Sequence, residues 1–343
     1  MKSININGRL VGAGHPTFVI AEAGVNHLGS LDTAIKMANM ALVAGADAVK
    51  FQHHLPDQEM LPDVPTSDNM REPLYDFLVK NALLLDDHIA LKKHCDSIGL
   101  QYLCTPFSFQ AALELHNNEL LDAIKIGSGE MTDLPSLARM ADFGVPMILS
   151  TGMSTFEEIN ATYSMMMDKK VSFALLNCVS EYPPEYDDIN LGVINKMQGA
   201  FPGAVIGHSD HTPTNYTAFA AVTLGAAIVE KHVIIDKLTP GPDQSVSLNF
   251  HEFNDLVSGI RIIEAASGDS KKVHEKEKAI REWAFRSVVA VKDIPAGKVI
   301  DQSDVWTKRP GTGIPSAKLN DVIGRTSTVF IKENTLLSWD QLK

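Results

Sequence analysis

Cysteine and long apolar runs are scarce in this chain, and each scarcity excludes a class of protein. Only three cysteines, Cys95, Cys104 and Cys178, occur among 343 residues. They are too few and too scattered for a disulfide framework and suit a reducing compartment, so we expect a cytoplasmic protein. The longest nearly apolar run, residues 218–229, is shorter than the ~20 residues of a membrane-spanning helix. Polar side chains also interrupt the N-terminus where a signal peptide has its apolar core, so we expect no membrane partner.

Basic side chains are also outnumbered, which bears on the possible partners. The sequence has 42 Asp and Glu against 30 Lys and Arg, for a net charge of −12. Nucleic-acid-binding domains usually carry a basic footprint, so we expect no nucleic-acid partner. A small anionic substrate remains possible, because a few lysines can create a local positive field inside an acidic protein.

Short runs rich in β-branched residues alternate with helix-length segments from residue 18 to about 266. This alternation favours a parallel α/β fold, and eight strands favour a closed (β/α)8 TIM barrel over an open sheet. We therefore predict a TIM-barrel domain over residues 1–266, with an active site at the carboxyl ends of its strands. The predicted strands are 18–23, 48–52, 101–104, 123–126, 146–150, 172–178, 204–207 and 228–232.

One connection, residues 53–86, is much longer than the others. It begins with His53 and His54 and contains several prolines. Connections of this length are usually functional or lack a fixed structure. We expect this one to help close the active site, and a plain surface insertion is the alternative.

The sequence pattern changes after Ser267. Residues 268–278, GDSKKVHEKEK, are strongly charged, and short predicted strands with Gly- and Pro-containing turns follow from Trp283. We predict a linker over residues 267–282 and a small β-rich domain over residues 283–343.

Two histidines stand at the ends of successive predicted strands, His211 in GHSDHT and His232 in VEKH. If the strands are parallel, the two imidazoles meet at one rim and can hold a divalent metal such as Mn²⁺, Fe²⁺ or Zn²⁺. Residues two apart in a strand share a face, so Glu230 should point with His232. Asp210 could orient an imidazole. The ordinary alternative is two hydrogen-bonded histidines without a metal.

Two lysines stand within apolar predicted strands, Lys50 in VKFQ and Lys125 in AIKIGSGE. A buried lysine is costly unless an anion satisfies its charge, so the pair indicates a phosphate or carboxylate site. The GSG phrase lets backbone N–H groups approach an anion, and Thr105 and Ser150 add hydroxyl donors nearby. We also expect Cys104 to line the site. A Schiff-base lysine, as in aldolases, and a lysine that extends to solvent are the alternatives.

Four carboxylates are expected at the same rim: Glu22, Glu130, Glu230 and Asp243. Glu22 ends the first predicted strand, which adjoins the eighth in a closed barrel, so it could lie near His232. Such groups could bind a hydroxylated substrate or move protons. Capping of loops is the plainer alternative for any one of them.

Taken together and in order, these phrases resemble the sialic acid synthase family. The matching phrases are AEAGVNHLGS, AGADAVKFQ, CTPFS, KIGSGE, ILSTGM, HSDHT, VEKH and PGPD. In the final domain, SVVAVKDIPAG and KRPGTGI look like the antifreeze-like (SAF) domain that ends this family. The resemblance therefore covers nearly the whole chain.

The resemblance implies an enzyme that condenses phosphoenolpyruvate with an N-acetylmannosamine-type aldose and releases phosphate. It implies Mn²⁺ or Mg²⁺ on His211 and His232, with the metal polarising the sugar aldehyde. Glu22, Glu230 and His232 become the candidate catalytic residues. The implied phosphoenolpyruvate-binding positions are Lys50, Thr105, Lys125, Ser128, Ser150 and Ser209, and the implied sugar-side positions are Gln52, Tyr182 and Asp243 together with Glu22.

The same resemblance implies a domain-swapped homodimer in which each SAF domain covers the barrel of the partner. Arg309 would then reach the acyl group of the sugar from the partner subunit, with Phe285 near the same group. Such a cover would exclude water from a reactive intermediate.

The chain departs from the family pattern at one position that bears on the sugar. Where members that make N-acetylneuraminate often have Asn-Ile-Tyr, this chain has Ser180-Glu181-Tyr182. Ser180 thus replaces an amide near phosphoenolpyruvate or the sugar. A simple sialic acid and a legionaminic-type product from a 2,4-diacetamido-trideoxy aldose suit the sequence equally well, and a pseudaminic-type product suits it less.

Other classes of function remain open on the sequence. A lysine-dependent aldolase predicts borohydride trapping with pyruvate and indifference to a chelator. A condensation on a phosphorylated sugar would need further basic residues for the second phosphate. A carbohydrate-binding or ice-binding protein, suggested by the C-terminal domain, leaves the rim histidines and the strand lysines without a role.

Overall fold

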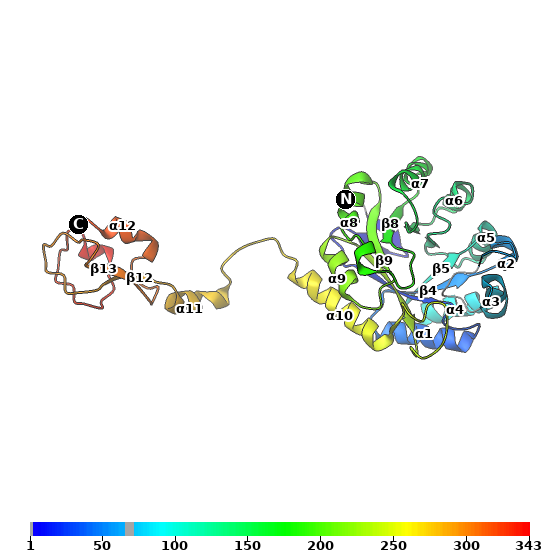
Figure 1. The fold of residues 1–343 in the computed structure, drawn as a ribbon, viewed down its shortest axis with the longest axis horizontal. Coiled ribbons are helices and arrows are strands. Elements are labelled where there is room, and N and C mark those ends of the chain that lie inside the picture. The colour runs from blue at the N-terminus through cyan, green and yellow to red at the C-terminus, as the bar shows by residue number, and fades with distance from the viewer. Residues whose placement is uncertain (1–2, 66–71) are drawn as a thin grey trace. The chain divides into compact units, whose positions relative to one another are not determined.

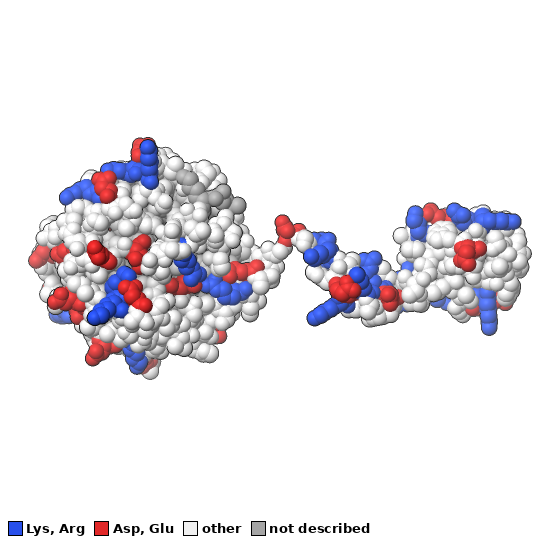
Figure 2. Space-filling view, turned by 180° about the vertical axis from the view of Figure 1, so that it is seen from behind, with Lys and Arg blue, Asp and Glu red and all other residues white. Residues whose placement is uncertain are grey.

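The computed structural model of the chain describes residues 3–65 and 72–343. Its contacts divide the chain into two compact units, Met1–Ser267 and Gly268–Lys343 (Figure 1). Within the described ranges, each helix is too short or too polar to cross a lipid bilayer. Acidic and basic side chains are interspersed on the face of the first unit that Figure 2 shows.

Among the described residues of the first unit, eight parallel strands close into a barrel. The last of them, β10, pairs with both β9 and β3, and this double pairing closes the ring. The structure thus confirms the predicted TIM barrel. The barrel strands are β3 (Phe18–Gly24), β4 (Ala48–His53), β5 (Gln101–Pro106), β6 (Ile124–Ile126), β7 (Met147–Ser150), β8 (Phe173–Cys178), β9 (Val205–Asp210) and β10 (Ile228–Ile234).

Helices follow the strands and surround them (Figure 1). The first of them buries Ala34, Met37, Ala38 and Ala41, a spacing of three and four residues that places one apolar face against the strands. Side chains such as Ser30 accept a hydrogen bond from a first-turn N–H group and fix where the helix begins. The surrounding helices are α1 (Leu31–Val43), α4 (Leu85–Ile98), α5 (Phe109–Asn117), α6 (Leu134–Ala141), α7 (Phe156–Lys169), α8 (Val193–Ala200), α9 (Tyr216–Thr223) and α10 (Phe250–Ala266). A short strand, β11 (Leu248–Asn249), pairs with β10 ahead of α10, and a single turn, η1 (Tyr186–Asp188), precedes α8.

An apolar layer fills the amino-terminal end of the barrel interior. A hairpin of β1 (Ser3–Ile6) and β2 (Arg9–Gly12) contributes Ile4, Ile6 and Val11 to the same cluster as Phe18 and Ile20 from the start of β3. This end of the barrel is therefore filled with apolar side chains, which leaves the opposite end for ligands.

The long connection after β4 is partly helical. It contains α2 (Pro56–Glu59) and α3 (Leu74–Asn81), while residues 66–71 of the same connection lie outside the described residues. Phe77 and Leu78 of α3 pack with Val25, which follows β3, and with Met60 and Leu74. The described part of the connection is therefore attached to the carboxyl end of the barrel.

The second unit has a small apolar core of its own. Its strands β12 (Ser287–Ala290) and β13 (Val305–Lys308) pair antiparallel, and isolated bridges and turns complete it. Val288, Ile294 and Ile331 are among the residues of its core. The helix α11 (Glu275–Ala284) has no buried residue. It covers the second half of the predicted linker and extends two residues past it. The remaining elements are η2 (Ser316–Lys318), α12 (Leu319–Val322) and η3 (Trp339–Gln341).

Candidate active site

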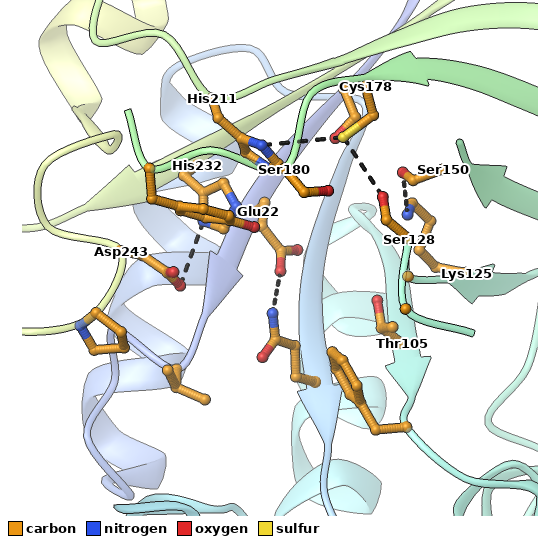
Figure 3. Close-up of a pocket in the computed structure, with 18 of the residues that line it drawn as sticks. Glu22, Thr105, Lys125, Ser128, Ser150, Cys178, Ser180, His211, His232 and Asp243 are labelled. Atoms are coloured by element: carbon orange, nitrogen blue, oxygen red, sulfur yellow. Dashed lines mark hydrogen bonds and ion pairs between the residues drawn. The ribbon is translucent and has the colours of Figure 1, made fainter. Parts of the chain in front are cut away.

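A pocket of about 680 Å³ opens at the carboxyl ends of the barrel strands. This volume suits a small-molecule site. Figure 3 shows His211, His232 and Asp243 on one side of it, Lys125, Ser128 and Ser150 on the other, and Glu22 between. The predicted residues that line it are Glu22, Lys50, Gln52, Thr105, Lys125, Ser128, Ser150, Ser180, Tyr182, Ser209, His211, Glu230, His232 and Asp243.

Lys50 is buried in an ion pair with Glu22. The two residues are register partners on neighbouring strands, and Lys50 Nζ lies 2.6 Å from Glu22 Oε2 and 2.9 Å from Thr105 Oγ1. Burial opposes the lysine charge, but Glu22 and Glu230 outweigh burial, so the pKa of Lys50 is raised. Lys50 is 3% exposed, so the alternative of a lysine extended to solvent is wrong.

Lys125 is held mainly by neutral partners. Its Nζ donates to Ser150 Oγ at 2.7 Å and to the carbonyl of Ile126 at 2.9 Å, and lies 3.7 Å from Glu230 Oε1. Burial lowers the pKa of Lys125 despite the opposing charge of Glu230, and the nearby Lys50 lowers it further. The two lysines therefore differ: Lys50 has a close carboxylate, and Lys125 has hydrogen bonds and a more distant one.

Glu230 lies between the two lysines. It accepts a hydrogen bond of 3.0 Å from Ser209 Oγ, and its other oxygen is 3.8 Å from Lys50 Nζ. Burial opposes ionisation, but Lys125 and Lys50 outweigh it and lower the pKa of Glu230 below its usual value. The carboxylates of the chain itself thus satisfy the lysine charges that the sequence left to a substrate anion.

Hydroxyl groups converge beside Lys125. Gly152 N–H donates to Ser128 Oγ at 3.1 Å. A Cβ at Gly152 would lie 2.2 Å from Ser180 Oγ and 2.7 Å from Ser128 Oγ, so only glycine lets these hydroxyls come so close to the backbone. Lys125, the hydroxyls of Ser128, Ser150 and Ser180, and an adjacent glycine form a cradle suited to the oxygens of an anion.

The two rim histidines lie together, as the sequence predicted. Their ring centroids are 5.2 Å apart, and Tyr182 stacks on His211 with centroids 4.3 Å apart. His211 Nδ1 donates to the carbonyl of Val179 at 2.7 Å, and His232 Nδ1 lies 3.5 Å from Asp243 Oδ2. Nδ1 of His211 is thus hydrogen-bonded and Nδ1 of His232 faces Asp243, which leaves the two Nε2 atoms as the ones available to a metal.

The donor set bears on the kind of metal that could bind. Among the residues the structure describes, no group of three or more His, Cys, Asp and Glu is arranged to hold a metal ion. His211 and His232 would supply two nitrogens and leave the other positions to substrate and water, as catalytic metal sites keep an open position. Burial lowers the pKa of His211, but Cys178 outweighs it and holds the pKa at about 9, so a metal would displace a proton there.

Two predictions about neighbouring side chains are wrong. Asp210 does not orient His211: it lies 3.1 Å from Lys231 Nζ on the outer face of the strands, and Thr217 Oγ1 donates to it. Cys104 does not line the pocket but packs between the barrel and the helices, whereas Cys178 lines the pocket. Strand alternation explains both, because Asp210 follows inward-facing Ser209 and Cys104 precedes inward-facing Thr105.

Three predicted substrate-binding residues do not line this pocket. Glu130 lies close to Gly127, and burial raises its pKa to about 7. Phe285 and Arg309 belong to the second unit. Phe285 is exposed, and Arg309 Nε donates to the carbonyl of Ala284 at 3.0 Å.

The long connection contributes pocket residues that the sequence analysis did not list among the site residues. His54 and Glu59 line the pocket beside Phe107, together with apolar side chains of the cluster around Phe77. Alternation could have identified His54, because it lies two residues after Gln52. No sequence pattern pointed to Glu59, which α2 brings back to the strand ends.

Comparison with known proteins agrees with the fold and with the resemblance. Residues 37–272 match the NeuB family and residues 285–343 match the SAF domain. The N,N'-diacetyllegionaminic acid synthase of Campylobacter jejuni is 35% identical over 94% of this chain and 98% of that protein. Human N-acetylneuraminate-9-phosphate synthase is 32% identical over 95% of this chain and 93% of that protein.

A solved structure gives the same result. The N-acetylneuraminic acid synthetase of Leptospira borgpetersenii, solved in complex with citrate, has a TM-score of 0.73 and 28% identity, covering 81% of this chain and 95% of that chain. The predicted resemblance is thereby confirmed. This chain belongs to the NeuB family and ends in a SAF domain.

Proposed function

We propose that this chain is a nonulosonic acid synthase, which joins phosphoenolpyruvate to an N-acylated amino aldose and releases phosphate. One observation carries the proposal: a single pocket brings two buried lysines and several hydroxyls within reach of a pair of imidazoles. The lysines and hydroxyls suit a small phosphorylated acid, and the imidazoles suit a metal that binds a carbonyl acceptor. Relatives named as legionaminic, sialic and pseudaminic acid synthases support it.

Phosphoenolpyruvate binds on the lysine side of the pocket. Lys50 and Lys125 donate to its phosphate and carboxylate oxygens, as do the hydroxyls of Thr105, Ser128, Ser150 and Ser209. The carboxylates now paired with the lysines fix their positions, so little reorganisation accompanies binding.

The acceptor aldose binds on the imidazole side. His211 and His232 hold Mn²⁺ or Mg²⁺, which supplies Lewis-acid polarisation of the aldehyde when bound. Tyr182 and Asp243 fix the two rings, and Glu22 and Gln52 bind hydroxyl or acylamino groups of the sugar.

The bonds change in a fixed order. The methylene carbon of phosphoenolpyruvate attacks the aldehyde carbon, whose oxygen takes up a proton. Water then adds to C2, which has become electron-poor, and loses a proton. Finally the bond between C2 and the bridging oxygen breaks, phosphate leaves with that oxygen, and the hydroxyl on C2 gives its proton to the phosphate and becomes the keto oxygen. Glu230, held ionised between the lysines, stabilises the positive charge at C2, and Glu22 accepts the proton from water.

The acceptor is an N-acetylmannosamine-type aldose or a 2,4-diacetamido-trideoxy aldose. Ser180 occupies the wall where Neu5Ac-making relatives often carry an amide, and it shares the cradle around Gly152 with Ser128. The active enzyme is a homodimer in which Arg309 and Phe285 of one subunit cover the acceptor bound to the other.

Phosphate release tests the function. The chain is incubated with Mn²⁺, phosphoenolpyruvate and each acceptor in turn, with and without EDTA. We expect chelator-sensitive release with one acceptor class and a product with the mass of the condensed sugar acid. Absence of release with every acceptor would contradict the proposed function.

A lysine-dependent aldolase is the second candidate, because Lys125 lines the pocket and burial lowers its pKa, which favours the neutral, nucleophilic amine. Borohydride with pyruvate separates the two. Covalent trapping on Lys125, with activity unaffected by EDTA, would favour the aldolase.

A further inference from the structure

A row of hydrogen bonds runs along one wall of the pocket from Lys50 to Glu59. Lys50 pairs with Glu22 at 2.6 Å, and Gln52 Nε2 donates to the other oxygen of Glu22 at 2.9 Å. Gln52 Oε1 lies 2.9 Å from His54 Nε2, and His54 Nδ1 lies 3.0 and 3.1 Å from the two oxygens of Glu59. The row joins the ion pair of the barrel to the connection after β4.

The ion pair fixes the direction of the donors in this row. Glu22 is an acceptor toward Lys50, so the amide nitrogen of Gln52 must face Glu22 and its oxygen must face His54. His54 Nε2 therefore carries a hydrogen and donates it to Gln52. At the other nitrogen, one proton lies between His54 Nδ1 and the carboxyl group of Glu59.

His54 is built into this place. Its ring stacks on Phe107 with centroids 4.3 Å apart and an interplanar angle of 18°. His54 is 6% exposed and the side chain of Glu59 is 4% exposed. The adjacent His53 faces the other way, where it lies 3.1 Å from Glu114 Oε2. Strand alternation explains the difference, because Lys50, Gln52 and His54 share one face.

We propose that His54 is a positioning residue that sets the specificity for the acceptor through Gln52. Gln52 lines the pocket, and its Nε2 has a second N–H that no contact among the described residues uses. His54 holds the amide so that this N–H faces the acceptor and donates to a hydroxyl or acyl oxygen. Without the donor on His54 the amide is held only by Glu22, so it can tilt about that hydrogen bond and move the second N–H away from the acceptor. This inference rests on the proposed function, because the acceptor is the aldose that the proposed reaction uses.

Paired variants test this role. His54→Phe keeps an aromatic ring to stack on Phe107 but removes both ring nitrogens and with them the hydrogen bonds to Gln52 and Glu59. His54→Gln restores a donor near the position of Nε2. His53→Gln changes the neighbouring residue outside the pocket and serves as the matched control, with the melting temperature of each variant as the check on folding.

The expected result is a split between the two substrates. His54→Phe raises the acceptor KM about tenfold or more, the value of one misplaced hydrogen bond, and changes the phosphoenolpyruvate KM less than about twofold. His54→Gln recovers most of the loss, and His53→Gln matches the wild type. Equal changes in both KM values, or no recovery in His54→Gln, would overturn the proposal.

A second readout does not need turnover. In protein labelled with ¹⁵N-glutamine, the side-chain amide signal of Gln52 is assigned by its loss in Gln52→Glu. We expect two inequivalent, slowly exchanging protons in the wild type and faster exchange in His54→Phe. An unchanged signal would overturn the positioning role whatever the activity. If the signal responds but no acceptor yields phosphate, the proposed function fails while the positioning role stands.

Discussion

The two ends of the barrel interior are built from the same strands yet differ in kind. On β3 the inward face passes from Phe18 and Ile20 to Glu22, and on β10 it passes from Ile228 to Glu230 and His232. A step of two residues, about 6.6 Å, separates an apolar layer from a layer of buried ions. The fold thus places its packing and its chemistry on one continuous face.

The two layers contribute to different free energies: the apolar layer to that of folding, and the ionic layer to that of the reaction barrier. The apolar layer lowers the free energy of the folded state through removal of surface from water. The ionic layer is costly to bury and is held by mutual pairing, as between Lys50, Glu22 and Glu230. Changes at the amino end should therefore alter stability, and changes at the carboxyl end should alter turnover.

The largest effect is expected at the imidazole pair. His211→Ala or His232→Ala removes one of the two nitrogens offered to the metal, and kcat should fall by about a thousandfold or more, equivalent to several kcal/mol. The melting temperature should change little. Turnover near the wild-type level in either variant would contradict the assignment of the metal to this pair.

Lys50→Met should have the next largest effect and, unlike the histidine variants, should lower both turnover and stability. It removes the cation between Glu22 and Glu230, and loss of one partner from a buried pair costs about 2–5 kcal/mol. We expect kcat/KM for phosphoenolpyruvate to fall at least about thirtyfold and stability to fall as well. An unchanged kcat/KM for phosphoenolpyruvate in the folded variant would show that Lys50 serves the fold alone.

Phe18→Ala probes the opposite end. Phe18 is completely buried in the amino-terminal layer, and its truncation should lower the free energy of unfolding by about 3–5 kcal/mol. The kcat/KM of the folded fraction should match the wild type, and Phe18→Leu should cost less stability. A loss of turnover in the folded fraction would contradict the prediction that the amino-terminal layer affects stability alone.

Glu130→Gln should have the smallest effect, visible in the pH dependence of stability. Burial raises the pKa of Glu130 to about 7 from 4.5. A proton on Glu130 therefore favours the folded state. Its contribution to the free energy of unfolding is complete below pH 4.5 and is lost as the pH rises through 7, by up to about 3 kcal/mol. Urea unfolding of both proteins from pH 4.5 to 8 should show the wild type losing stability relative to Glu130→Gln. Parallel curves would refute the shift.

Much of this site was predictable because strands have a period of two. Alternation places Glu230 and His232 on the same face of β10, and closure of the barrel brings Glu22 beside His232. The positions of the eight strands follow from the same sequence pattern. Alternation also corrects the two mistakes, since Cys104 and Asp210 each stand one residue from an inward-facing neighbour.

The partners of the buried charges were less predictable. A lone lysine in a strand indicates a need for an anion, yet nothing in the sequence says whether a substrate or a distant carboxylate supplies it. Glu59 reaches His54 through the path of the connection after β4, and no local pattern encodes that path. The SAF unit was recognisable from its motifs, whereas the roles proposed for Arg309 and Phe285 require the proposed second subunit.

One isotope measurement tests the central claim most directly. Phosphoenolpyruvate labelled with ¹⁸O at the bridging oxygen is turned over with the accepted aldose, and the released phosphate is analysed by mass. The account predicts that the label leaves with phosphate, one phosphate for each sugar acid formed. Label retained in the organic product, or phosphate released without an aldose, would contradict a condensation at this pocket.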